Sequence, residues 1–196
     1  NIDDCVGEYD DCSVCNGDGT SCLDNIISLG AATDSNLEVL YSSSSDIGGF
    51  QFTVSGADVF GGSGGAAGDA GFEISSGGSI VLGFSFDGSV IPAGAGLLTN
   101  LDIAVTDFEA CLSDVVISNI DAQQVDFETG GCVDLPCNDE DGDLVCDNID
   151  ECIGEIDDCG ICNGDNADQD CNGDCFGDAF VDDCGVCSEG NTGHDA

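Results

Sequence analysis

Large apolar residues in the middle of the chain recur at every second position. Three segments show this alternation most clearly: Phe50, Phe52 and Val54; Ile80, Leu82, Phe84 and Phe86; and Leu101, Ile103 and Val105. A period of two is typical of a β-strand that turns one face toward a core. Similar stretches near Leu37, Val115 and Val125 extend the pattern, so the sequence predicts seven to nine short strands.

Turn-forming residues separate these segments. Stretches rich in Gly, Ser and Asp lie between the predicted strands, as in GGSGGAAG from Gly61. Short strands joined by such turns favour an antiparallel β-sandwich. We therefore predict an all-β domain over residues 24–132, a length that can enclose one hydrophobic core.

The two flanks lack this pattern. Residues 1–23 and 133–196 contain few large apolar side chains and show neither helical nor strand periodicity. Burial cannot offset the chain entropy of such segments, so disulfides and metal ions have to replace the core. The predicted order is an acidic Cys-rich connector (1–23), the sandwich (24–132), an aspartate-rich string (133–152) and a Cys-rich array (153–196).

The net charge of the chain limits the kinds of partner that it can bind. The chain has 41 acidic residues, one His and neither Lys nor Arg, which gives a formal net charge of −41. Two carboxylates about 4 Å apart repel by roughly 4 kcal/mol at an effective dielectric constant of about 20, so cations from solution must balance the clusters. Nucleic acid and anionic membrane surfaces are excluded as electrostatic partners, because both attract basic patches.

The chain also contains 15 cysteines. This density is typical of a disulfide scaffold in an oxidising compartment and predicts an extracellular protein, secreted or on a cell surface. No apolar run is long enough to span a bilayer. The acidic start is unlike a signal peptide, and both ends fall inside repeated phrases, so we expect a piece of a longer protein. An odd cysteine suggests a bond to another chain or to an omitted segment.

The stretch DEDGDLVCDNIDEC, from Asp139 to Cys152, spaces aspartates through a short loop. Its candidate ligands are Asp139, Asp141, Asp143, Asp147 and Asp150. Carboxylates at alternate positions of a tight loop can converge on Ca²⁺, which takes six to eight oxygen ligands. The stretch resembles the thrombospondin type 3 repeat, which implies bound calcium, but it has Leu144 where that family often has glycine. The alternative is an acidic linker that is solvated and binds no calcium.

A second string, DQDCNGD, places further oxygen donors in the spacing that opens an EF-hand loop, but it lacks the closing Glu. Its candidate ligands are Asp168, Asp170, Asn172 and Asp174. A plain Asn-Gly turn is the alternative.

One cysteine phrase recurs through both flanks. The opening NIDDCVGEYDDCSVCNGD is matched at thirteen of eighteen positions by the stretch from Asn148, and related wording returns as VDDCGVCSEG from Val181. These phrases resemble the Cys-rich arrays found beside thrombospondin-type calcium repeats in large secreted proteins. The resemblance implies that His194 is a repeat position and no catalytic base.

Residues 24–132 resemble cohesin-like and related carbohydrate-binding sandwiches of secreted bacterial proteins, from ISLGAATDSNLEVLY through VLGFSFDG to ACLSDVVIS and a closing GGC. The resemblance rests mainly on strand pattern. Within it, we expect Cys111 and Cys132 to form a disulfide across the last strands.

Two chemical alternatives carry less weight. The paired CxxC motifs, such as Cys159 and Cys162 with Cys184 and Cys187, are compatible with Zn²⁺. Four thiolates around zinc would add negative charge to an acidic field, so structural disulfides are favoured. The motif HExxH is absent, and the one match to GxSxG is GGSGG within the glycine run from Gly61. A carboxylate pair could act on a glycoside, yet the chain has no Trp and only Tyr9 and Tyr41 as a sugar platform. We expect no enzyme.

We therefore expect a structural segment of a long, calcium-stabilised extracellular fibre, appendage or matrix protein that assembles with copies of itself. One alternative is a recognition module for a dockerin-like partner or a polysaccharide. Another is the non-catalytic tail of a secreted enzyme. An exposed apolar face on the sandwich would favour recognition, whereas a face covered by a neighbouring chain would favour assembly.

Overall fold

A computed structural model describes residues 5–196. The expectation that residues 1–4 begin the connector falls outside these residues. The chain divides into two compact units, Asn1–Cys137 and Asn138–Ala196, here called the sandwich unit and the array unit. No helix in the described residues has the length and apolar character needed to cross a membrane.

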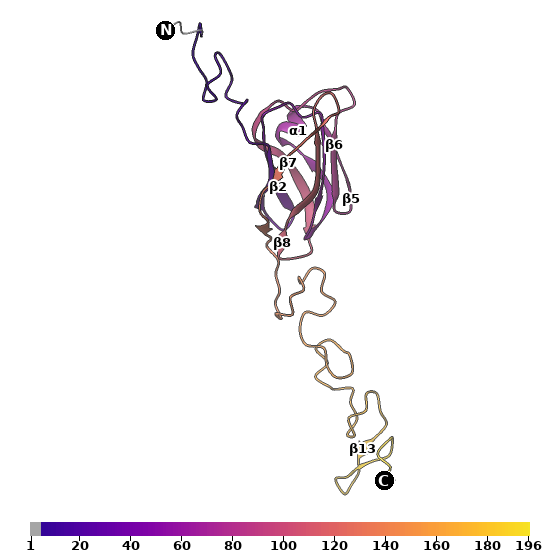
Figure 1. Cartoon of the computed structure of the whole chain (residues 1–196). Coiled ribbons are helices and arrows are strands. Elements are labelled where there is room, and N and C mark those ends of the chain that lie inside the picture. Colours follow the sequence, from indigo (N-terminus) through magenta and orange to yellow (C-terminus); the bar gives the residue numbers. More distant parts are fainter. Residues whose placement is uncertain (1–4) are drawn as a thin grey trace. The chain divides into compact units, whose positions relative to one another are not determined.

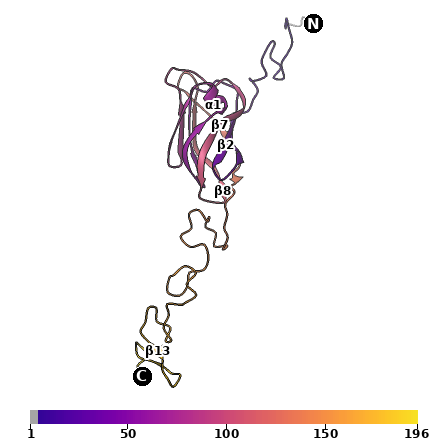
Figure 2. The same cartoon turned by 180° about the vertical axis from the view of Figure 1, so that it is seen from behind.

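Two five-stranded sheets form the sandwich unit (Figures 1 and 2). The first sheet has the order β11-β1-β2-β7-β4 and consists of Glu128–Thr129 (β11), Ile26–Ala32 (β1), Asn36–Ser43 (β2), Gly94–Val105 (β7) and Ala57–Ser63 (β4). The second has the order β10-β9-β3-β6-β5 and consists of Gln124–Val125 (β10), Leu112–Ser118 (β9), Gly49–Val54 (β3), Ile80–Phe84 (β6) and Glu73–Gly77 (β5). All pairs are antiparallel except β1 with β11.

Short elements complete both units. A one-turn helix, Gly65–Asp69 (α1), follows β4, and Glu109–Ala110 (β8) pairs with Val133–Asp134 (β12). In the array unit, Phe180–Val181 (β13) pairs with Cys187–Ser188 (β14). The prediction of an all-β fold with an antiparallel sandwich is confirmed.

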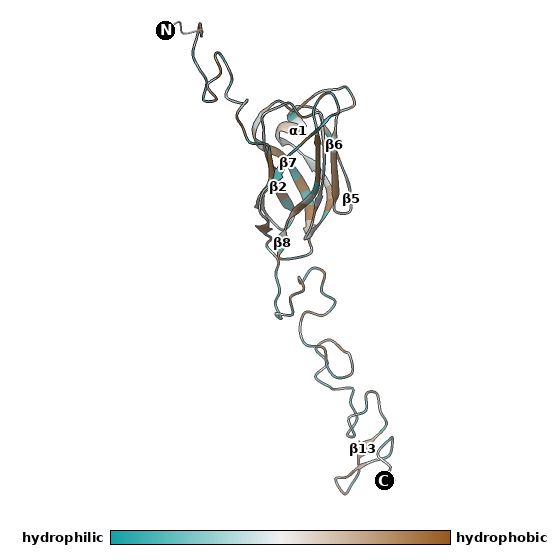
Figure 3. Cartoon of the chain, in the orientation of Figure 1, coloured by the Kyte–Doolittle hydropathy of each residue, from teal (hydrophilic) through white to brown (hydrophobic). Residues whose placement is uncertain are grey.

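Alternating side chains build the sandwich core, where the hydrophobic colour of Figure 3 runs along the strands. On β3, Phe50, Phe52 and Val54 are buried. On β7, Leu101, Ile103 and Val105 are buried as well. The Phe50 ring stacks on both Phe52 and Phe72, with ring centroids 5.8 and 6.1 Å away.

The alternation at residues 80–86 identified a strand but not its buried face. In β6 the core residue is Val81, which is fully buried, whereas Ile80 and Leu82 point outward and are 48% and 41% exposed. The reason lies at Gly83: a methyl group added there would overlap the ring of Phe50. A bulky neighbouring ring therefore fills the core position that Gly83 leaves open, and the larger β6 side chains take the solvent face.

Candidate functional site

The aspartate string from Asp139 folds into an irregular loop held by its own carboxylates. Asp139 accepts hydrogen bonds from the backbone N–H groups of Gly142 (2.7 Å) and Leu144 (3.1 Å). Leu144 adopts a left-handed conformation with φ of 73° and its side chain is exposed. Leu144 stands where the thrombospondin type 3 repeat often has glycine. A left-handed backbone conformation at a residue other than glycine costs roughly 1–2 kcal/mol.

Three of the five predicted ligands come together. Carboxylate oxygens of Asp139, Asp141 and Asp143 all lie within 4.8 Å of one another. The Gly154 N–H donates to Asp141 at 2.6 Å and is the main cause that lowers the pKa of this carboxyl. Converging carboxylates, in a chain with neither Lys nor Arg, form the hard-oxygen donor set that suits Ca²⁺.

The other two predicted ligands lie outside this cluster. Asp147 accepts a hydrogen bond from the Glu140 N–H at 2.9 Å. Asp150 accepts one from the Cys152 N–H at 2.7 Å through Oδ1, while its Oδ2 is buried without a hydrogen-bond partner. A buried carboxylate oxygen is costly to leave unpaired. The orphaned oxygen and the three clustered carboxylates both fit a bound cation.

The second predicted string is arranged differently. Asp168, Asp170 and Asp174 do not form a cluster of the kind seen at Asp139. Both oxygens of Asp170 accept backbone hydrogen bonds, as those of Asp139 do; the donors are Asn172 and Asp174 at Oδ1 and Ala179 at Oδ2. The Asn172 side-chain amide donates to Asp174 at 2.9 Å. Asp170 thus has a structural role within the loop.

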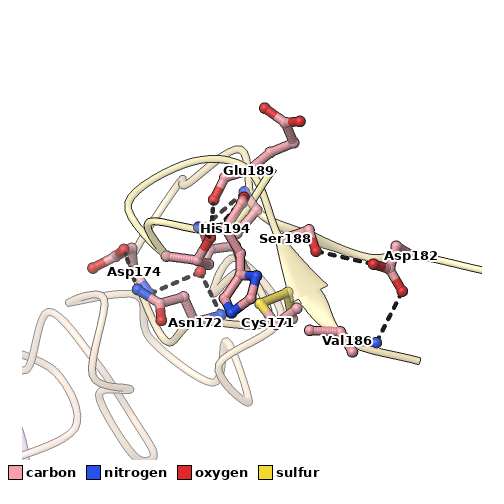
Figure 4. The surroundings of a disulfide bond; sticks show 12 residues. Cys171, Asn172, Asp174, Asp182, Val186, Ser188, Glu189 and His194 are labelled. Carbon is pink, nitrogen blue, oxygen red and sulfur yellow. Dashed lines mark hydrogen bonds between the residues drawn. A yellow bond between two sulfur atoms is a disulfide. The ribbon is translucent and has the colours of Figure 1, made fainter. Parts of the chain in front are cut away.

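Asp170 is one of four equivalent carboxylates, which we call the aspartate clamps: Asp10, Asp157, Asp170 and Asp182. In each clamp, Oδ1 accepts the N–H groups two and four residues later at 2.8–3.0 Å, and Oδ2 accepts a third hydrogen bond from further along. Figure 4 shows the last clamp, where Asp182 contacts Val186 and Ser188. These bonds lower the pKa of all four carboxyls, since they favour the ionised form.

Disulfides lie within the clamped loops, between successive loops and in the sandwich. The bonds are Cys5–Cys15, Cys12–Cys22, Cys111–Cys132, Cys152–Cys162, Cys159–Cys175 and Cys171–Cys187, and Cys137 and Cys146 are also disulfide-bonded. The structure thus joins Cys111 to Cys132, the pair expected from the sequence. Of the four cysteines in the zinc alternative, three are oxidised with other partners and only Cys184 keeps an exposed thiol.

The outer face of the second sheet carries an apolar strip. Gln51 pairs with Leu82 on one side and with Val116 on the other, so these three side chains stand in one row. Leu82 and Val116 are 41% and 43% exposed. Beyond the end of β6, the ring of Phe86 packs edge-on against Phe84 at 4.9 Å and is itself highly exposed. The sequence pattern contained Leu82, Phe84 and Phe86 but assigned them to the core.

A hollow of about 660 Å³ lies beside α1, where the lining residues are Tyr41, Ala66, Asp69, Ala70, Ser89, Val90 and Pro92. Tyr41 is its one aromatic side chain; burial raises its pKa, and its hydroxyl donates to the Pro92 carbonyl at 3.3 Å. The hydroxyl of Ser89 is engaged with Asp87 at 2.7 Å.

Comparisons with known proteins return structures of cohesins but no family. No family model and no curated protein matches the chain. A non-cellulosomal cohesin from the archaeon Archaeoglobus fulgidus is 17% identical, with a TM-score of 0.43 over 57% of this chain and 91% of that one. A chain of the complex between a CaDoc0917 variant and CaCohA2 is 15% identical, with a TM-score of 0.41 over 56% of this chain and 96% of that one.

A type I cohesin–dockerin complex from Clostridium thermocellum, Coh-OlpC with Doc435, gives 15% identity and a TM-score of 0.41 over 58% of this chain and 92% of that one. At such low identities and TM-scores, these likenesses assign neither a family nor a function. The antiparallel sandwich rests on the strand pairings themselves.

Proposed function

We propose that this chain is a non-catalytic extracellular recognition module, in which the outer face of the second sheet binds a partner protein. The part of the apolar strip that lies on and just beyond β6 carries this proposal. Ile80, Leu82 and Phe86 expose large apolar side chains on or just beyond one strand. Covering such surface contributes roughly 25 cal/mol per Å² of buried apolar area, and contiguous exposed patches mark interaction sites.

Charge defines the chemistry of the partner. With a net charge of −41 and no Lys or Arg, this chain repels acidic surfaces on every side. A fitting partner therefore presents an apolar centre with a neutral or basic rim. A dockerin-like module is the partner class implied by the sequence resemblance, and it is preferred over a polysaccharide because the hollow beside Tyr41 offers a single aromatic ring.

Binding of purified dockerin modules, measured by calorimetry, tests the proposal. Leu82→Ser should weaken binding at least tenfold, because it removes the centre of the strip. Phe60→Ser is the matched control: Phe60 is 70% exposed and lies on β4 of the other sheet, so its loss should leave binding unchanged. Equal effects of the two substitutions, or no binding by any dockerin, would count against this partner.

We also propose that Ca²⁺ stabilises the aspartate-rich string by binding at Asp139, Asp141 and Asp143. The cluster of carboxylates and the buried, unpaired oxygen of Asp150 support this assignment. Asp141→Asn should weaken the tightest calcium site at least tenfold in a calorimetric titration. Asp121→Asn, the same change of charge at an exposed turn, should not. An unaltered calcium isotherm in Asp141→Asn would remove the assignment.

A structural segment of a fibre or matrix is the second candidate function. It is favoured by the repetition of one clamped, disulfide-bonded loop through both flanks, an arrangement that can extend without a hydrophobic core. Here the apolar strip would be covered by another copy. Light scattering during a Ca²⁺ titration separates the candidates: growth of large particles that Leu82→Ser abolishes supports assembly, whereas a persistent monomer supports recognition.

A further inference from the structure

The loop that follows β6 carries a highly exposed aromatic ring. Ile80, Leu82 and Phe84 share the outer face of the strand, because the residues between them are buried. Phe86 continues this alternation just beyond the strand, and its side chain is 84% exposed. The ring of Phe86 therefore lies at one end of the apolar strip.

The position of this ring is defined by one aromatic contact. It meets the ring of Phe84 edge-on, with 4.9 Å between the centroids and 85° between the planes. Phe84 pairs across the sheet with Gly49, which has no side chain to cover either ring. Burying more of an exposed ring lowers the free energy of the chain, so a flexible loop would let Phe86 settle against the sheet.

Asp87 holds the loop in a tight turn, residues 85–89, which we call the Asp87 turn. Its Oδ1 accepts three hydrogen bonds: from the hydroxyl of Ser85 at 2.6 Å, from the hydroxyl of Ser89 at 2.7 Å and from the Ser89 N–H at 3.0 Å. Gly88 has a φ of 80°, a left-handed conformation that favours glycine, and completes the turn.

The acceptor of these three bonds is an ionised carboxylate at neutral pH. The hydroxyls of Ser85 and Ser89 lower the pKa of Asp87 to about 2. Hydrogen bonds to a charged acceptor are shorter and stronger than those between neutral groups. Phe86 lies in the chain between Ser85 and Asp87, so the residues on both sides of it belong to this network.

A hollow of about 130 Å³ adjoins the Asp87 turn. Ser85 and Ser89 line one side of it, and the turn between β9 and β10, with the highly exposed Ile120, lines the other. The turn that carries Phe86 therefore also borders space that a side chain of a partner could enter.

We infer that Asp87 is a positioning residue for recognition, which holds the Phe86 ring exposed as an anchor at the end of the apolar strip. The inference rests on the proposed function and concerns the same partner, a protein with an apolar centre and a neutral or basic rim. A ring held in place before binding loses less conformational entropy when the partner covers it, which improves affinity.

Substitutions of Asp87 in the full chain test the inference. Asp87→Ala removes the acceptor of all three hydrogen bonds, whereas Asp87→Asn keeps an Oδ1 that can accept them. Asp58→Ala is the matched control, because it removes an exposed carboxylate from β4 of the other sheet. Urea unfolding of each variant verifies that the sandwich stays folded.

The first measurement follows the Phe86 ring in the free chain by NMR. Nuclear Overhauser contacts between the rings of Phe84 and Phe86 should be equally strong in the unmodified chain, in Asp87→Asn and in Asp58→Ala. In Asp87→Ala they should fall at least threefold, because the ring loses its fixed place. Unchanged contacts in Asp87→Ala would overturn the inference, whatever the strip binds.

The second measurement is calorimetric binding of a dockerin module that the unmodified chain binds. Phe86→Ser and Asp87→Ala should each weaken binding at least fivefold, while Asp87→Asn and Asp58→Ala should change it less than twofold. The double variant should bind no more weakly than Phe86→Ser alone, since Asp87 acts through that ring.

The double variant separates positioning from a general structural role. Losses that add up in the double variant would mean that Asp87 acts independently of Phe86, and the inference would be wrong. Full binding by Phe86→Ser would equally exclude the ring as an anchor. If no dockerin module binds the unmodified chain, the proposed function fails, and the ring contacts in the free chain still decide whether Asp87 holds Phe86 in place.

Discussion

The sandwich unit and the array unit are stabilised by different means, although one polypeptide contains both. The sandwich unit buries large side chains such as Phe52, Leu101 and Ile117 between two sheets. In the array unit, the buried residues among the described ones are Cys146, Cys152, Ala179 and Ser188, with no large apolar side chain among them. A segment with so little to bury cannot offset its chain entropy by the hydrophobic effect.

The array unit replaces that effect with covalent bonds and aspartate clamps. Its disulfides close loops of 10 and 16 residues, for which about 3 kcal/mol each is typical through loss of unfolded-state entropy. The clamps satisfy backbone N–H groups that no sheet or helix pairs. The comparison teaches that loop-rich segments remain ordered where short covalent loops and local hydrogen bonds substitute for a core.

Reduction of the disulfides should have the largest effect, and it should act on the array unit and on the Cys-rich residues 5–23 while sparing the β-sandwich. In excess dithiothreitol, the array unit should lose its order, because the aspartate clamps alone are too weak to offset its chain entropy. The sandwich should persist, since buried side chains stabilise it and it contains one disulfide, Cys111–Cys132. Hydrogen exchange would show fast exchange across residues 138–196 and protected β3 and β7. Parallel loss of protection in both units would contradict the comparison.

A cavity in the sandwich is the converse perturbation. Phe52 is fully buried, so Phe52→Ala should destabilise the sandwich by about 3–5 kcal/mol. Phe60→Ala, at a side chain that is 70% exposed, should change stability by less than about 0.5 kcal/mol. Urea unfolding followed by hydrogen exchange measures both. Altered exchange at Ile161 or Val186 in Phe52→Ala would show that the units do not fold independently.

Sequence reasoning identified the sandwich because its strands obey a simple period. The buried face was predicted correctly at β3 and β7, where every second residue is large. It was wrong at β6, because the position of Phe50 over Gly83 is a packing relation between strands that no single-strand pattern contains. The packing of Phe50 over Gly83 also leaves Ile80 and Leu82 on the exposed face of β6. The sequence pattern therefore missed the apolar strip that supports recognition.

The clamps were present in the sequence but were not distinguished from metal ligands. Asp170 belongs both to an EF-hand-like string and to the recurring Asp-x-x-x-x-Cys phrase. In the structure, backbone N–H groups occupy both of its oxygens. Disulfide connectivity was equally out of reach, because cysteine number alone allows many pairings. Only the folded loops reveal that Cys159 and Cys171 each bond to the loop that follows.

Acid should have the smallest of these effects, and it can be followed at a single clamp. The pKa of Asp182 is lowered below 3.8, chiefly by the hydrogen bond from the Val186 N–H. A depressed folded-state pKa means that the clamp contributes stability above the unfolded value and loses this contribution as the pH falls through the folded value. The loop at residues 182–188 should therefore loosen only below about pH 3.8, the ordinary value of Asp.

Amide chemical shifts of Cys184 and Val186, followed by NMR between about pH 2 and pH 6, measure this transition. Asp182→Asn should abolish it, since the amide does not titrate. Asp183→Asn, the neighbouring change of the same charge at an exposed residue, should leave the midpoint below 3.8. A midpoint at or above 3.8 in the unmodified chain would mean that the clamp does not favour the ionised carboxylate. In that case the array unit would depend on its disulfides and cations alone.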